Sequence, residues 1–228
     1  MIERGFKRIV LNAFFVLSGL ILLAPISFAD KEANGQQIMD CIVARAGNEP
    51  ITLRETIVRA SLWRGRIVSA SEPNVIKDTI VKLVNQKLII SESRKFSELK
   101  LNPAAIERTK KMIIDLIGGK KRLADLLHEL NVGRSEFKEI VREETLVREF
   151  IKNKFVPFVF VTPDEIQNYY RNEVLKYSFS PEKAPPLSKI ESQIRNVIKQ
   201  EKINKALFNW LSRKKEDVNV EIFYPCNE

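Results

Sequence analysis

The segment that most constrains the fold is a long amphipathic stretch over residues 188–216. Its apolar residues form two sets with the same i, i+4, i+7, i+8 spacing, which is typical of a helical face. The first set is Ile190, Ile194, Val197 and Ile198, and the second is Ile203, Leu207, Trp210 and Leu211. An offset of thirteen residues, at about 100° per residue, puts the sets on different faces of one helix. We therefore expect a helix capped by Ser188 that packs against one body early and a second body late.

The rest of the chain also predicts a mostly helical protein. Helix starts are marked by Thr52 followed by Glu55, by Asn102-Pro103 and by Thr162 followed by Glu165, which are capping signals. A wide apolar face predicts a buried helix after Pro73; its members are Ile76, Ile80, Val81, Leu83, Val84, Leu88, Ile89 and Ile90. Strands are expected over 38–46, ended by a turn over 47–50, and over 218–224, and an extended segment over 156–161.

The first residues predict export from the cytoplasm. Arg4, Lys7 and Arg8 precede an apolar run over 9–26, and Ser27 and Ala29 are small residues suited to a signal peptidase. We expect residues 1–29 to be a signal peptide that is cleaved after Ala29, leaving a periplasmic protein. The alternative is an inner-membrane anchor facing the periplasm, because the run is about as long as a minimal spanning helix.

Two cysteines, Cys41 and Cys226, are present. In an oxidising compartment a lone pair suggests one disulfide, although two free thiols remain the alternative. Together with His128, the single histidine, they match no familiar metal-site spacing, so no metal or other cofactor is expected.

The formal net charge of +9 does not point to nucleic acid. Basic residues are interleaved with acidic ones, as in Arg142-Glu143-Glu144 and in residues 199–202. This pattern is typical of a solvated mixed-charge face. Contact with a membrane is expected only through residues 1–29, if they are retained.

Several motifs occur in an informative order. After the predicted strand and capped helix, residues 83–90 read LVNQKLII; residues 135–144 read SEFKEIVREE, and residues 161–170 read VTPDEIQNYY. The last two resemble the "S-x-E-E-F-x-x-x-L-R" and "V-T-D-E-E-I-x-x-Y-Y" segments of the SurA and PrsA family of extracytoplasmic foldases. The long helix and the terminal strand are similar to the end of that family's core.

The resemblance implies a SurA-like helical core over residues 30–177, completed by a long helix and strand over 188–228. It also implies that the N- and C-terminal strands pair in a small sheet; if they pair antiparallel, Cys41 lies beside Cys226. Family members usually carry a parvulin prolyl isomerase domain before the terminal helix. Here only a proline-rich linker, residues 178–187, occupies that place, so we expect no enzyme activity.

The family core binds polypeptide, so the resemblance implies an ATP-independent holdase for unfolded outer-membrane or secreted proteins. The residues predicted to bind them are Phe155, Phe158, Phe160, Tyr169, Tyr170, Tyr177 and Phe179, with ordinary core packing as the alternative for each. The main alternative function is a dedicated adaptor or subunit of an envelope complex with one fixed partner. A prolyl isomerase is the third possibility.

Overall fold

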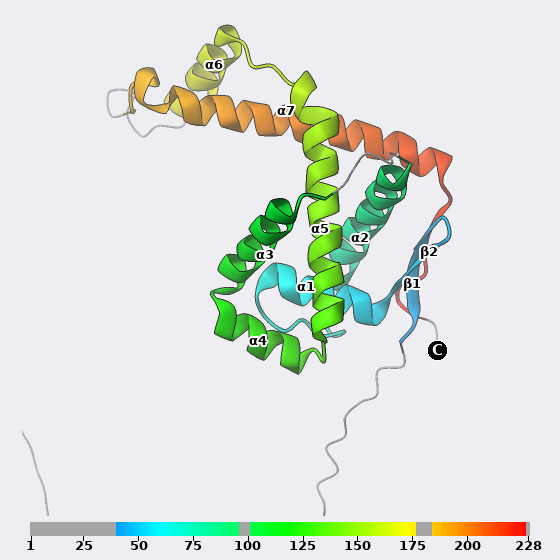
Figure 1. Ribbon diagram of the computed structural model, residues 1–228. Coiled ribbons are helices and arrows are strands. Elements are labelled where there is room, and N and C mark those ends of the chain that lie inside the picture. Colours follow the sequence, from blue (N-terminus) through cyan, green and yellow to red (C-terminus); the bar gives the residue numbers. More distant parts are fainter. Residues whose placement is uncertain (1–39, 96–100, 177–183, 227–228) are drawn as a thin grey trace, which may run out of the picture. The chain divides into compact units, whose positions relative to one another are not determined.

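The two ends of the predicted core meet in a small antiparallel sheet (Figure 1). The computed structural model describes residues 40–95, 101–176 and 184–226, all within one unit of the chain, Ile38–Glu228. Strand β1 (Ile42–Ala46) lies between β2 (Glu49–Thr52) and β3 (Val220–Ile222). Ala44 is opposite Ile222, so the predicted pairing of N- and C-terminal strands is confirmed.

Strand β2 replaces much of the predicted turn over 47–50. The turn contains only Gly47, with a φ of 60°, and Asn48, while Glu49 and Pro50 already belong to β2. Pro50 is tolerated because β2 is an edge strand, where a residue without a backbone N–H need not break the ladder. Strands β1 and β2, residues 42–52, therefore form a tight hairpin that the sequence did not predict.

Five helices pack with this sheet into the body of the fold. They are α1 (Leu53–Arg64), α2 (Pro73–Arg94), α3 (Pro103–Ile117), α4 (Lys120–Glu129) and α5 (Arg134–Phe155). The backbone N–H of Glu55 donates to Thr52 Oγ1, and that of Ala104 donates to Asn102. The protein is thus mostly α-helical with a small sheet, as predicted.

The wide apolar face of α2 forms the centre of what we call the main core, together with β1, part of α5 and the end of α7. Every residue predicted for this face is buried except Val81, which is exposed. Val81 lies at the edge of the predicted apolar face of α2, on the side of the helix that faces solvent. Helices α3 and α4 cover the other side of α1, around Val58 and Leu62.

Beyond α5 the chain makes a short 3₁₀ helix, η1 (Val156–Phe158), and then α6 (Pro163–Tyr169), which continues as a π-helical stretch, η2 (Tyr170–Leu175). The predicted capping box of Thr162 and Glu165 is confirmed in both its hydrogen bonds. The extended segment predicted over 156–161 is wrong for its first half, because η1 tightens the last turn of α5, a common ending of α-helices.

Helix α7 (Leu187–Asp217) belongs to two cores. Ile194 and Ile198 pack with Ile166 of α6 in a small core, whereas Ile203 and Trp210 lie in the main core. Figure 1 shows α7 running from α6 across one end of α5 towards the sheet. The prediction of two packing faces is confirmed, although Val197 is 41% exposed.

The start of α7 differs from the prediction. The N-cap position is occupied by Pro186, and no side chain caps the helix. Ser188 is therefore already inside the first turn, because the extended Pro186 leads directly into a helix that begins at Leu187.

Cys41 and Cys226 form the predicted disulfide, with Cα atoms 6.5 Å apart. Both are half-buried against the main core. This bond fits an oxidising, extracytoplasmic location. Within residues 40–95, 101–176 and 184–226, no helix is long and apolar enough to cross a membrane. The predicted signal peptide, residues 1–29, lies outside the described residues, and the predicted domain boundaries remain predictions.

Candidate functional site

The aromatic residues predicted to bind polypeptide lie in different environments. Phe155 is buried, with its ring centroid 6.3 Å from that of Trp210 in the main core. Tyr169 and Tyr170 are partly buried against the small core, and the Tyr170 hydroxyl donates to the Pro185 carbonyl at 2.9 Å. Tyr177 and Phe179 lie outside the described residues. The five predicted residues that the structure describes are therefore divided between the main core, the small core and the exposed surface.

Phe158 and Phe160 are different, because 78% and 76% of their respective surfaces are exposed. Between them, Val159 has an extended backbone and packs against the main core. Phe158 ends η1 and Phe160 follows Val159, so the two exposed rings lie two residues apart in the chain, and we call them the aromatic pair.

The backbone beside the aromatic pair is held by α7. Lys202 Nζ donates to the Phe160 carbonyl at 2.7 Å and forms an ion pair with Glu165 Oε1 at 2.6 Å. Arg195 donates to the Val161 carbonyl at 3.2 Å. The hydrogen bond from Lys202, with that from the Thr162 backbone, lowers the pKa of Glu165, so this carboxylate is ionised at neutral pH. Two exposed rings are thus presented on a fixed backbone beside charged groups.

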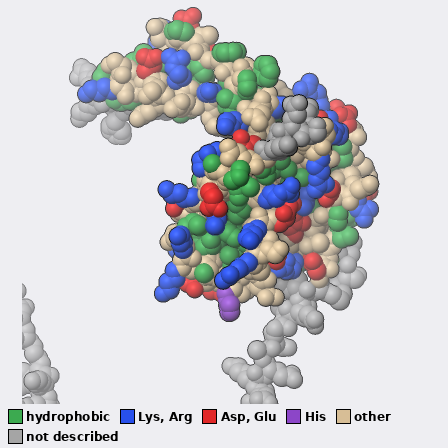
Figure 2. All heavy atoms as spheres, in the orientation of Figure 1, with side chains coloured by type: hydrophobic (Ala, Val, Ile, Leu, Met, Phe, Trp, Pro, Cys, Tyr) green, Lys and Arg blue, Asp and Glu red, His purple; other side chains and the backbone are tan. Residues whose placement is uncertain are grey.

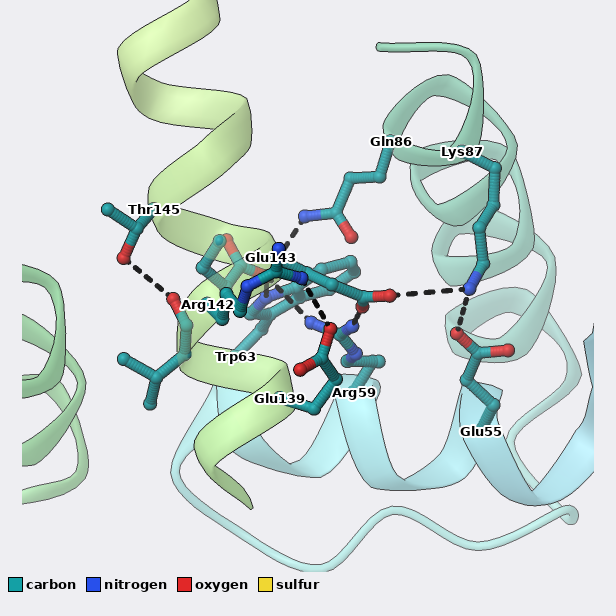
Figure 3. Close-up of polar contacts among 11 residues, drawn as sticks. Glu55, Arg59, Trp63, Gln86, Lys87, Glu139, Arg142, Glu143 and Thr145 are labelled. Carbon is teal, nitrogen blue, oxygen red and sulfur yellow. Dashed lines mark hydrogen bonds and ion pairs between the residues drawn. The ribbon is translucent and has the colours of Figure 1, made fainter. Parts of the chain in front are cut away.

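A buried charged cluster connects α1, α2 and α5 (Figure 3). Arg59 of α1 forms ion pairs with Glu143 and Glu144 of α5, and its side chain is only 3% exposed. The Glu144 Oε1 atom also accepts from Trp63 Nε1 at 3.0 Å and from Gln86 Nε2 at 2.9 Å. The carboxylate of Glu144 is therefore shared by three donors from two helices.

Lys87 of α2 extends the same cluster. Its Nζ atom lies 3.0 Å from Glu55 Oε1 and 3.7 Å from Glu143 Oε1. The side chain of Glu55 is thus directed to Lys87, and only the Thr52 half of the capping box predicted for α1 is present.

The expectation of a solvated mixed-charge face at Arg142-Glu143-Glu144 is wrong for its two acids. Arg142 is exposed, but the Glu143 and Glu144 side chains turn towards Arg59 and are mostly buried. Sequence reasoning missed Arg59. A signal exists in the sequence: Arg59 is the single charged residue between Thr56 and Trp63, an otherwise apolar or small stretch in which all side chains up to Leu62 are buried.

Two cavities flank Arg59. One, of about 300 Å³, is lined by charged residues that include Glu55, Lys87 and Glu143. The other, of about 250 Å³, lies between α1, α3 and α5 and is lined mainly by apolar residues, including Trp63, Met112 and Leu116. Residues of the charged cluster thus line both a polar cavity and an apolar one.

No protein-family model matches the chain, and no curated protein matches it. The resemblance to SurA-like foldases therefore remains a prediction. In the described part of the chain no three His, Cys, Asp or Glu side chains are grouped to hold a metal ion, and His128 is exposed in the last turn of α4.

Proposed function

We propose that the protein is an ATP-independent periplasmic holdase, a chaperone that binds unfolded or partly folded envelope proteins, chiefly outer-membrane or secreted ones, without catalysing prolyl isomerisation. The observation that carries this proposal is the aromatic pair. Two Phe side chains that are two residues apart and three-quarters exposed offer apolar surface that another molecule can bury.

The energetics of the aromatic pair suit reversible binding. Burying one Phe side chain contributes roughly 1.5–3 kcal/mol, and association has to overcome a loss of translational and rotational freedom of several kcal/mol. Two rings therefore give weak binding that accepts many sequences, because the hydrophobic effect is not directional. Nearby charges, such as Glu165 and Lys202, keep the complex soluble.

Export by a signal peptide over residues 1–29, cleaved after Ala29, completes the proposal. It is supported by the disulfide between Cys41 and Cys226, which is stable in the periplasm and not in the cytosol. A retained inner-membrane anchor facing the periplasm is the alternative arrangement.

A dedicated adaptor with one fixed partner is the second candidate function. The observation that favours it is the rigid attachment of the aromatic segment to α7 through Lys202 and Arg195. A preorganised surface binds a single partner with a smaller loss of entropy than a mobile one.

The test is the aggregation of an unfolded outer-membrane protein, followed by light scattering without ATP. The mature protein should slow aggregation, and Phe158→Ser combined with Phe160→Ser should remove most of this effect with little loss of stability, since both side chains are exposed. The matched control is Val197→Ser, which changes a less exposed apolar residue of α7.

Equal suppression by the double variant would show that the aromatic pair does not bind clients. Failure of the unaltered protein to slow aggregation, with one stoichiometric partner after crosslinking in cells, would support the adaptor. In the same preparations prolyl isomerisation should stay at its uncatalysed time of tens to hundreds of seconds; acceleration would contradict the proposed lack of enzyme activity.

A further inference from the structure

A second apolar surface lies away from the aromatic pair, in the groove formed by the cavity between α1, α3 and α5. Met112 and Leu116 of α3 are 49% and 62% exposed, and as i and i+4 residues they share one face of the helix. The other apolar residues of the lining are Leu62 and Trp63 of α1, Ile113 of α3 and Ile140 of α5. Figure 2 shows hydrophobic side chains gathered over the region of α3 and α5, with Lys and Arg side chains around them.

The charge available to a ligand in this groove is positive. Glu144 and Arg59 both line it and form an ion pair with each other at 3.2 Å, so their two charges offset one another. Arg148 also lines the groove; it is exposed and forms no ion pair with the described residues. Lys82 lies with its Nζ atom 5.7 Å from the centre of the Trp63 ring. A bound group near the rim is therefore favoured if it is negative.

The size of the groove favours a side chain over a free small molecule. Its volume of about 250 Å³ is below the roughly 300–1,000 Å³ of sites that enclose small molecules. Met112 adds adaptability, because an unbranched thioether side chain fits differently shaped apolar partners.

We propose that the groove binds segments of client polypeptides in which one or two large apolar side chains are flanked by Asp or Glu. The proposal rests on the proposed function for the identity of the client. The groove would thus prefer client segments with acidic residues. The aromatic pair would not provide this preference, because its two rings are apolar.

The test uses two labelled peptides with the same pair of Leu residues, one flanked by Glu and the other by Lys. Fluorescence anisotropy should show the Glu peptide binding about fivefold more tightly, the effect of one partly exposed ion pair, and the difference should shrink at high salt. Arg148→Glu should abolish or reverse the preference. Leu116→Glu should weaken binding of both peptides, whereas the matched change Val197→Glu should not.

Tryptophan emission locates the contact. The chain has two Trp residues; Trp210 is buried in the main core, so an emission change on adding the Glu peptide should disappear in Trp63→Phe. Equal affinities for the two peptides, or an emission change that persists in Trp63→Phe, would overturn the proposal. So would a dimer, seen by analytical ultracentrifugation, that Leu116→Glu dissociates, since the groove would then hold a second copy of the chain.

The result is separable from the test of the proposed function. Suppression of aggregation that depends on the aromatic pair, without any preference for the Glu peptide, would support the proposed holdase function and contradict the proposed ligand of the groove. A preference for the Glu peptide that depends on Arg148, without suppression of aggregation, would support the proposed ligand of the groove and contradict the proposed holdase function.

Discussion

At the scale of single residues, Arg59 brings a full positive charge into the contact between α1 and α5, where its side chain is 3% exposed. Removing one partner of a buried ion pair leaves the other charge uncompensated. We expect Arg59→Ala to lower the free energy of unfolding by about 3–5 kcal/mol, measured by urea denaturation. The cost is high because Glu143 and Glu144 both lose their guanidinium partner.

The matched control is Arg54→Ala in the same helix. Arg54 forms an ion pair with Glu136 at 2.6 Å, but its side chain is 44% exposed. Exposed pairs contribute about 0–1 kcal/mol, so this variant should stay close to the original stability. If the two variants lower the free energy of unfolding by the same amount, the cluster around Arg59 is solvated, and its description as a buried cluster between the two cavities is wrong.

Local signals predicted some residues, although the expected Ser188 cap and the Glu55 half of the first capping box are absent; contacts between residues far apart in the chain were not predictable. The capping box of Thr162 and Glu165 depends on only four consecutive residues, and it was correctly predicted. Arg59 and Glu143 are 84 residues apart, and nothing in the spacing of either one identifies the other. The same limit applies to the candidate site: Phe155 and Phe158 are three residues apart, yet only packing against Trp210 decides that the first is buried.

At the scale of elements, α7 allows its two packing faces to be tested separately. Ile194→Ala should expose α6 and η2 to hydrogen exchange while leaving the midpoint of global unfolding nearly unchanged, since among the described residues Ile166 and Ile198 are its only buried partners in the small core. Ile203→Ala, in the main core, should lower the free energy of global unfolding by about 2–5 kcal/mol.

Val197→Ala, on the exposed side of the same helix, controls for changes in helix propensity. Hydrogen exchange read by mass spectrometry resolves the two regions. The same loss of protection in both Ile variants would mean that α7 and its neighbours open as one unit, contrary to the separation of the two cores.

The elements themselves were largely predictable where apolar periodicity is long. The burial pattern of α2 and the change of face in α7 both follow from spacing alone. Strand β2 was missed because a two-residue turn at Gly47-Asn48 is followed at once by Pro50, a residue that more often marks a turn than a strand.

At the scale of the whole molecule, the disulfide closes a loop of 185 residues. A chain-entropy argument gives it up to about 5 kcal/mol of stabilisation through the unfolded state, and measured values are often smaller. We expect Cys41→Ser, Cys226→Ser and the double variant to lower the denaturation midpoint by the same amount. Thiol labelling before and after reduction should find no free thiol in the unaltered protein.

A smaller loss of stability in the double variant than in either single variant would indicate a harmful free thiol and not a missing cross-link. Full labelling of the unreduced protein would contradict the bond. β3 pairs with β1 independently of the disulfide, and Phe223 N, just beyond β3, donates to the Val43 carbonyl at 2.8 Å, so the variants should still fold.

The main core contains both β1 and the far end of α7. This arrangement also determines the order in which the parts of the core become available during synthesis. Ile203, Trp210 and β3 are made long after β1, α1 and α2. Until residues 203–222 have been synthesised and delivered, the apolar sides of α2 and α5 lack the cover that α7 provides, and β1 lacks one neighbour. The main core therefore cannot be completed while the chain is still emerging from a ribosome or a translocation channel. Until its last part has arrived, the chain exposes the same kind of apolar surface that we propose it protects in others.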